Sequence, residues 1–229
     1  MFYNCIALTQ APALPATTLA DGCYNRMFQG CTSLTQAPAL PATTLASSCY
    51  YSMFQGCTSL TQAPALPATT LASICYNNMF YGCSNLTQAP ALPATTLASS
   101  CYSNMFYDCT SLTQAPALPA TTLSESCYSN MFSGCSNLTQ APNIKTYTSN
   151  LYAFENMLST FDSSTGKWGK LTICTWPDLT LSEAESIVLK ETIFGYDNPG
   201  SDVRISITCK DGNAIAYYNS ENWTWVFEH

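Results

Sequence analysis

The sequence is short of charged residues and of histidine, and both shortages limit its chemistry. Only 9% of its 229 residues are charged, against roughly 25% in an ordinary domain. Its single histidine is residue 229, so no histidine inside the fold can act as a general base or bind a metal. A glycine-rich phosphate loop, a nucleophile–base set and an acidic metal cluster are also missing. We therefore expect a protein that is not an enzyme and that holds no cofactor or metal.

Two further absences exclude classes of partner. The chain has a net charge of −7 and no basic stripe, which argues against nucleic-acid binding because phosphate contacts need clustered Lys and Arg. No apolar run in the sequence approaches the roughly 18 residues that a membrane-spanning helix needs. We expect neither a nucleic-acid partner nor a membrane span in this chain.

What the sequence has in excess is repetition. The twelve residues LTQAPALPATTL occur five times from Leu8 onward, and every step is 26 residues. Met-Phe pairs recur with the same period, and a cysteine follows each pair. A sixth copy begins with LTQAP at Leu138 and then degenerates, which is typical of a capping repeat. Because so short a unit cannot bury a core alone, the copies must stack on one another.

Charge divides the chain into two parts. Through Phe161 there are four acidic and two basic residues, a net of −2, whereas the rest has ten acidic and five basic residues, a net of −5. This predicts a solenoid of about six coils over residues 1–161 and a small α+β capping module over residues 162–229. Since Met1 already lies in the middle of a repeat, the chain also looks cut from a longer protein.

Each repeat predicts an extended half and a helical half. Leu34, Ala37 and Ala39 would point inward, with Gln36 and Pro38 on the other face. Proline is excluded from central strands because it lacks a ladder N–H. We therefore expect a short strand over about residues 33–37, followed by a polyproline-like stretch through residue 44.

The helical half reads CYYSMFQGC. Cys49, Met53 and Cys57 recur at i, i+4 and i+8, which indicates one face of a helix. Gly56 could end that helix. The second half of the coil is thus predicted to hold one or two helical turns.

The run Phe28-Gln29-Gly30-Cys31-Thr32-Ser33-Leu34-Thr35, followed by a proline-ended strand and a short helix, resembles the BspA-like leucine-rich repeats of bacterial surface proteins. The repeat is longer than that family's usual one, and cysteine and methionine stand where the family often has isoleucine and alanine. The resemblance implies an α/β repeat solenoid of short parallel strands and short helices, right-handed, with a parallel sheet on one side. It also implies a secreted or surface-exposed protein with adhesive or binding roles.

Thirteen cysteines would ordinarily suggest a disulfide scaffold. Here the number is odd, and eleven of them sit at two strictly repeated positions among apolar neighbours. Free cysteine behaves as a small buried hydrophobe, so we expect ladders of buried thiols. Bridges between some coils and a metal site are the alternatives.

Glutamine is the candidate binding residue of the array. One glutamine per coil would form an amide ladder: Gln10, Gln36, Gln62, Gln88, Gln114 and Gln140. The amides could hydrogen-bond one another structurally, or they could meet a periodic ligand such as a glycan or a repetitive protein surface. Variation between copies is concentrated at residues 20–22, 25–26 and 29 and their equivalents, which fits either a solvated edge or a contact surface.

The tail predicts one helix and three strands. Residues 182–185 read as a capping box, so a helix is expected over about 182–191. Strands are expected at 202–209, 213–218 and 222–228, with a tight turn at Asp211-Gly212. Trp223 and Trp225 would share one face of the last strand, as core residues or as an exposed pair for sugar stacking. Residues 168–176 are expected to dock on the sixth coil.

The leading functional hypothesis is an extracellular or cell-surface repeat module that mediates adhesion through a glycan or a host or matrix protein. The alternative is a purely structural spacer that presents another domain.

Overall fold

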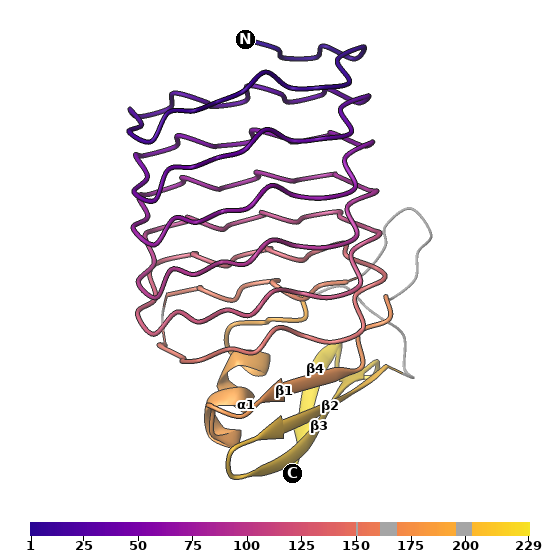
Figure 1. The fold of residues 1–229 in the computed structure, drawn as a ribbon. Coiled ribbons are helices and arrows are strands. Elements are labelled where there is room, and N and C mark those ends of the chain that lie inside the picture. The colour runs from indigo at the N-terminus through magenta and orange to yellow at the C-terminus, as the bar shows by residue number, and fades with distance from the viewer. Residues whose placement is uncertain (150, 161–168, 196–202) are drawn as a thin grey trace.

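The structure is a computed structural model that describes residues 1–149, 151–160, 169–195 and 203–229. Figure 1 shows the chain winding into a stack of coils, with the helix and the four strands gathered at its C-terminal end. Each coil takes 26 residues, which is the period of the sequence. Backbone N–H groups of one coil bond to a carbonyl 25 positions ahead, in the next coil. Phe28 N–H, for example, donates to Met53 O at 3.0 Å. The expected repeat fold is confirmed, but the predictions for both halves of the repeat need correction.

The predicted helical half is a run of consecutive turns, which we call the turn ribbon (residues 20–31, 46–57, 72–83, 98–109 and 124–135). Met53 N–H bonds back three residues to Tyr50 O at 3.2 Å, whereas Phe54 N–H bonds forward to the next coil. Every fourth residue has a positive φ: Ser48 at 53°, Ser52 at 51° and Gly56 at 70°. An α-helix needs negative φ throughout, so the helix prediction is wrong.

The extended half, which we call the proline face, consists of residues 34–45 and the equivalent residues of the other copies. Among the described residues of the array, pairing on this face is limited to isolated parallel bridges, as between Gln10 and Gln36 or Thr44 and Thr70. The two prolines in each copy contribute no N–H to a ladder, so the middle of the face stays largely unpaired. The predicted short parallel strands are therefore reduced to single bridges. Pro38, expected outside, is buried, and Ala39, expected inside, is exposed.

The core is built from ladders of identical side chains. One ladder of phenylalanine rings, from Phe2 to Phe132, repeats at 5.6–5.7 Å. A second ladder of tyrosine rings, from Tyr24 to Tyr128, repeats at 5.7–5.9 Å. Cysteine, methionine and leucine of the same coils are buried beside them. Each coil therefore covers the apolar face of the next.

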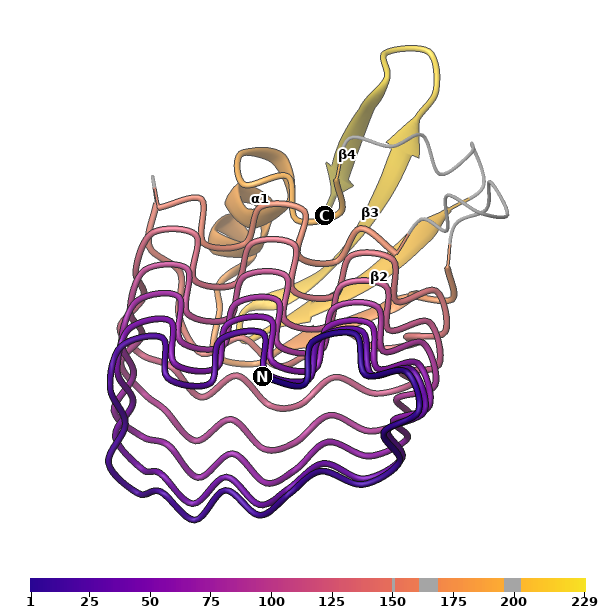
Figure 2. The same ribbon diagram turned by 90° about the horizontal axis from the view of Figure 1, so that it is seen from above.

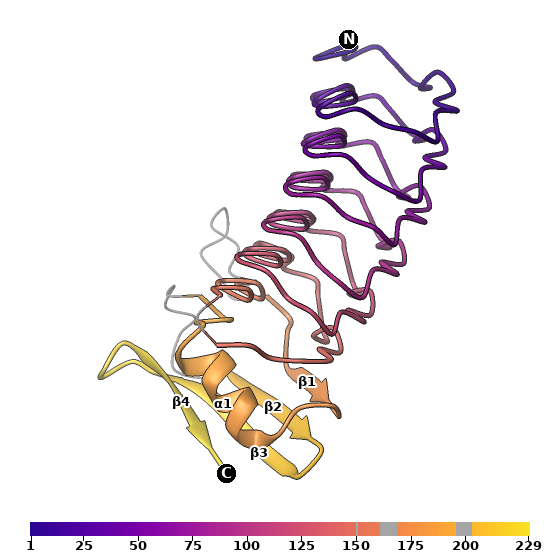
Figure 3. The ribbon, with the colours of Figure 1, turned by 90° about the vertical axis from the view of Figure 1, so that its left-hand side faces the viewer.

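The stack is curved. On the outer edge of the turn ribbons, the rings of Tyr81 and Tyr107 lie 4.7 Å apart, closer than the 5.6–5.9 Å of the buried ladders. Figure 2 shows the turn ribbons as stepped traces on one side of the stack and smoother traces on the opposite side. The bend is visible in Figure 3. The turn ribbons are thus on the concave side, and the proline face is on the convex side.

The C-terminal elements form one mixed sheet and one helix. They are β1 (Ile173–Trp176), α1 (Leu181–Leu189), β2 (Arg204–Cys209), β3 (Gly212–Asn219) and β4 (Thr224–Glu228). The sheet order is β1-β2-β3-β4, and only the pairing of β1 with β2 is parallel.

The described part of the tail continues the stack directly. β1 forms a parallel bridge to the sixth coil between Ile173 and Gln140. The indole N–H of Trp176 donates to Pro142 O at 3.1 Å, and Lys145 pairs with Asp178 at 2.7 Å. The predicted docking on the sixth coil is thereby confirmed from Gly169 onward. The predicted boundary at residues 161 and 162 lies outside the described residues.

Strand predictions in the tail hold better than turn and cap predictions. Ile205 and Ile207 are buried and alternate with exposed residues along β2, as expected. The helix begins earlier than predicted, because Thr180 is the N-cap and Glu183 completes the capping box. The hairpin turn falls at residues 210 and 211, since Gly212 already pairs with Cys209.

Candidate functional site

The six predicted glutamines lie on the proline face, and all are exposed. None of their side-chain amides makes a hydrogen bond to any described residue. Among the described residues of the array, the one amide-to-amide bond, Gln29 to Gln55 at 2.9 Å, lies on the turn ribbons instead. The interpretation of a self-bonded amide ladder therefore finds no support in the geometry. Each amide keeps its donors and its acceptor for solvent or for a ligand.

Shallow hollows open between coils on this face where the backbone is not bridged. One of about 400 Å³ lies between Gln36 and Gln62, and one of about 300 Å³ lies between Gln114 and Gln140. Alanine and proline line two more hollows of about 400 and 410 Å³ in the middle of the face. The five complete copies of this segment contain no charged residue. The face therefore offers amides, hydroxyls and small apolar groups.

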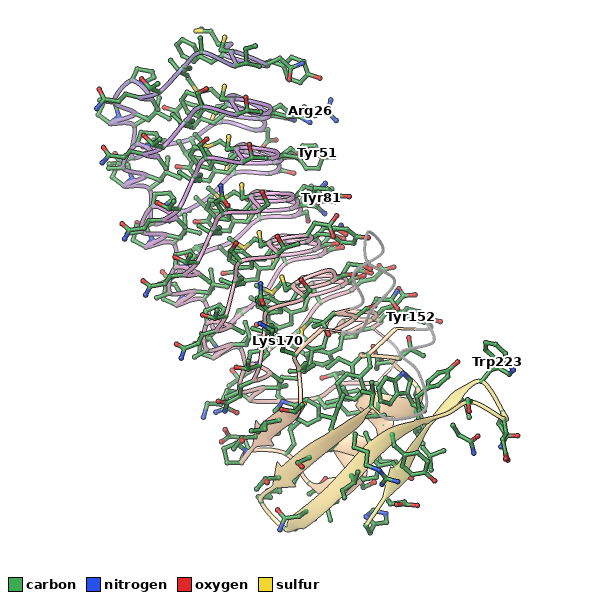
Figure 4. The ribbon with its side chains drawn as sticks, turned by 90° about the vertical axis from the view of Figure 1, so that its right-hand side faces the viewer. Arg26, Tyr51, Tyr81, Tyr152, Lys170 and Trp223 are labelled. Atoms are coloured by element: carbon green, nitrogen blue, oxygen red, sulfur yellow. The ribbon has the colours of Figure 1, made fainter. Side chains whose placement is uncertain are left out.

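The variable positions of the turn ribbons form a second surface, which the sequence predicted as either a solvated edge or a contact surface. Here the guanidinium of Arg26 lies over the ring of Tyr51, 5.4 Å from its centroid, and the Asn78 amide donates to the Tyr51 hydroxyl at 3.4 Å. Hydrogen bonding from Arg26 lowers the pKa of the Tyr51 phenol. Figure 4 shows Arg26, Tyr51 and Tyr81 in a row along this edge. The variable positions therefore form one continuous surface.

The two predicted tryptophans do not share a face. Trp223 precedes β4, in the left-handed region at φ 54°, and is 71% exposed. Trp225 is only 6% exposed, and its ring packs 4.8 Å from Phe194 and edge-on to Tyr218. The prediction failed because β4 begins at Thr224, so the strand alternation does not reach Trp223. Both tryptophans still line one hollow of about 210 Å³.

The cysteines are free, and all but Cys5 and Cys23 are buried. Burial raises the pKa of the Cys57 and Cys75 thiols to about 12, so these groups stay protonated at neutral pH. Within the described ranges, no cluster of three or more Cys, His, Asp or Glu side chains could hold a metal ion. In the same ranges, no helix has the length and apolar character to cross a membrane.

Comparison with known proteins identifies a family to which the repeat array is similar. A family model described as a BspA type leucine-rich repeat region, in 6 copies, matches residues 1–138 and 52–165. No curated protein and no solved structure gives a significant match. The matched residues include every coil described above and amount to more than half of the chain, and the family suggests a surface-associated role. The chain therefore belongs to the BspA-type leucine-rich repeat family.

Proposed function

We propose that this chain is a non-enzymatic, surface-exposed module that mediates adhesion by binding an uncharged glycan on its proline face. The observation that carries the proposal is the set of six exposed glutamine amides, one per coil, that make no hydrogen bond to the part of the chain that the structure describes. A purely structural ladder would use these groups internally.

The chemistry of the face favours a periodic ligand. A polymer built from one repeating unit meets the same glutamine, threonine and proline at each coil. A single hydrogen bond contributes only about 0.5–1.5 kcal/mol net, but linked contacts reinforce one another through a high effective concentration. The absence of charge in the five complete copies favours neutral sugars over acidic ones.

A glycan array tests the proposal. The intact chain should bind one or more neutral polysaccharides, and the double variant Gln88→Ala/Gln114→Ala should bind at least about tenfold more weakly. Gln55→Ala is the matched control, because it removes the same amide from the turn ribbons, where that amide is bonded to Gln29. Loss of binding in both variants, or in neither, would contradict the assignment to this face.

The alternative function is a structural spacer. It is favoured by the continuous backbone bonding between coils, since Phe28, Phe54 and Phe80 each donate to the next coil. If the array gives no signal on any neutral glycan, the spacer becomes the better account.

A further inference from the structure

The concave side of the molecule carries a second surface, which differs from the proline face in shape and chemistry. Solenoids commonly use their concave side for binding, because the curvature presents many repeats to one partner. Here that side is formed by the turn ribbons, where Tyr81 and Tyr107 approach to 4.7 Å. The residues that change from copy to copy lie there, so each coil can meet a different part of a partner.

We call the partly or fully exposed tyrosines of this side the tyrosine edge (Tyr51, Tyr81, Tyr107 and Tyr152). Tyr152 is 60% exposed and the other three are half-buried. Figure 4 shows that Tyr51, Tyr81 and Tyr152 follow one edge of the stack, and that Trp223 projects on the same side. The β3–β4 hairpin also projects from the turn-ribbon side in Figure 2. The aromatic groups therefore line the inside of the bend.

Three of these side chains, Tyr51, Tyr81 and Tyr107, are already ordered by their neighbours. The rings of Tyr81 and Tyr107 are parallel within 4°, and Arg26 covers the ring of Tyr51. Pre-ordered side chains lose little entropy on binding. Tyrosine, tryptophan and arginine are the residues that dominate protein–protein contacts. A neighbouring group covers one ring face of each of Tyr51, Tyr81 and Tyr107, which leaves these rings less suited to stacking on a sugar ring.

The net negative charge of the concave side indicates which class of partner it can bind. The turn ribbons and their sixth-coil counterpart, residues 151–160, carry one basic residue, Arg26, and the acidic residues Asp21, Asp108, Glu125 and Glu155. Complementary charge steers association and suppresses wrong partners. An acidic concave surface suits a convex surface that carries lysine or arginine.

We infer that the tyrosine edge binds a protein partner that presents a convex, basic surface. This site is independent of the glycan site, since the two lie on opposite sides of each coil. A chain with both sites would link a neutral polysaccharide to a protein.

Selection from a phage-displayed library of random peptides on the immobilised full chain tests the inference. Enriched peptides should carry several Lys or Arg residues and should bind less at high salt. Their affinity should fall at least about tenfold for Tyr81→Ala/Tyr107→Ala, and Glu125→Gln should weaken it by a smaller factor. Gln88→Ala/Gln114→Ala is the matched control and should leave peptide affinity unchanged.

Three outcomes would overturn the inference: no enrichment of basic peptides, equal binding to the tyrosine double variant, or loss of binding in the glutamine control. Thermal melting of each variant shows whether it remains folded. Glu125→Gln changes an exposed group and keeps the test valid if the tyrosine variant unfolds. Glycan binding should survive the tyrosine variant, which separates this inference from the proposed function.

Discussion

The thiol of Cys83 donates a hydrogen bond of 3.0 Å to the backbone carbonyl oxygen of Phe54 in the preceding coil. The same bond joins Cys57 to Phe28 and Cys109 to Phe80, both at 3.1 Å. The repeated cysteine is thus a small core residue whose polar hydrogen already has a partner. This explains why the position takes cysteine without any need for a disulfide.

Thiol counting follows from that arrangement. In native protein without reductant, a thiol reagent should titrate only the exposed Cys5 and Cys23 rapidly, and all 13 cysteines should react in denaturant. Buried thiols with a raised pKa offer almost no thiolate to the reagent. Fewer than 13 thiols in denaturant would mean that some cysteines are bridged.

Alkaline pH should destabilise the fold. Burial raises the pKa of Cys57 and Cys75 from 9.0 to about 12, so between these values the folded state binds more protons than the unfolded state. Stability is therefore fully present below pH 9 and is lost as pH rises toward 12. The midpoint of urea unfolding should fall steadily from pH 8.5 upward, within about this window. A flat profile up to pH 11 would contradict the burial of the thiols.

Phe80→Ala should cost about 3–5 kcal/mol of unfolding free energy. The ring is fully buried and stacks between Phe54 at 5.7 Å and Phe106 at 5.6 Å, so truncation opens a cavity between coils. Gln88→Ala, on the exposed face of the following coil, should change stability by no more than about 0.5 kcal/mol. Denaturant unfolding measures both, and a loss below 1 kcal/mol for Phe80→Ala would place the ring outside the core.

Ile74→Gly should stabilise the protein. Ile74 has φ 62° and is 37% exposed, whereas Ser48, Ser100 and Ser126 occupy the equivalent positions. A left-handed conformation costs a β-branched residue about 1–2 kcal/mol, which glycine avoids. We expect a gain of about 0.5–1 kcal/mol after the added entropy of the unfolded chain. The converse variant, Ser100→Ile, should lose stability. A loss of stability in Ile74→Gly, or a gain in Ser100→Ile, would refute the argument.

Removal of residues 162–229 should make the array oligomerise or precipitate. The truncation uncovers the sixth coil, whose Ala141 N–H donates to Ile173 O and whose Ser136 O accepts from Lys170 N–H. An unpaired edge beside apolar surface promotes association. Sedimentation should show species larger than a monomer. A monomer with an unchanged melting temperature would show that the tail folds independently.

The period and most of the core could be predicted because both depend only on which residues repeat. The helix could not, because residues at i, i+4 and i+8 share a face both in a helix and in a ribbon of four-residue turns. The distinguishing signal was present at Ser48, Ser52 and Gly56. Small residues at every fourth position mark sites that require a positive φ.

Burial on the proline face was mispredicted for a related reason. Strand alternation was applied across Pro38, but the segment does not alternate as a strand there. As a result, Leu40 is buried and Ala39 is exposed. The candidate site was predicted in part: the glutamines are exposed as expected, whereas the tyrosine edge depends on curvature that no single repeat encodes.

Backbone hydrogen bonds between coils are dense on the turn ribbons and sparse on the proline face, and this difference has a mechanical consequence. The turn ribbons are joined at nearly every second residue, whereas the prolines leave the other side joined at a few points. The coils are therefore joined mainly along the turn ribbons and can separate more easily along the proline face. We expect tension along the stack to open the proline side first and so to bend the arc more sharply toward the turn ribbons before any turn-ribbon bond breaks. An array of this kind would yield under tension and then recover its shape.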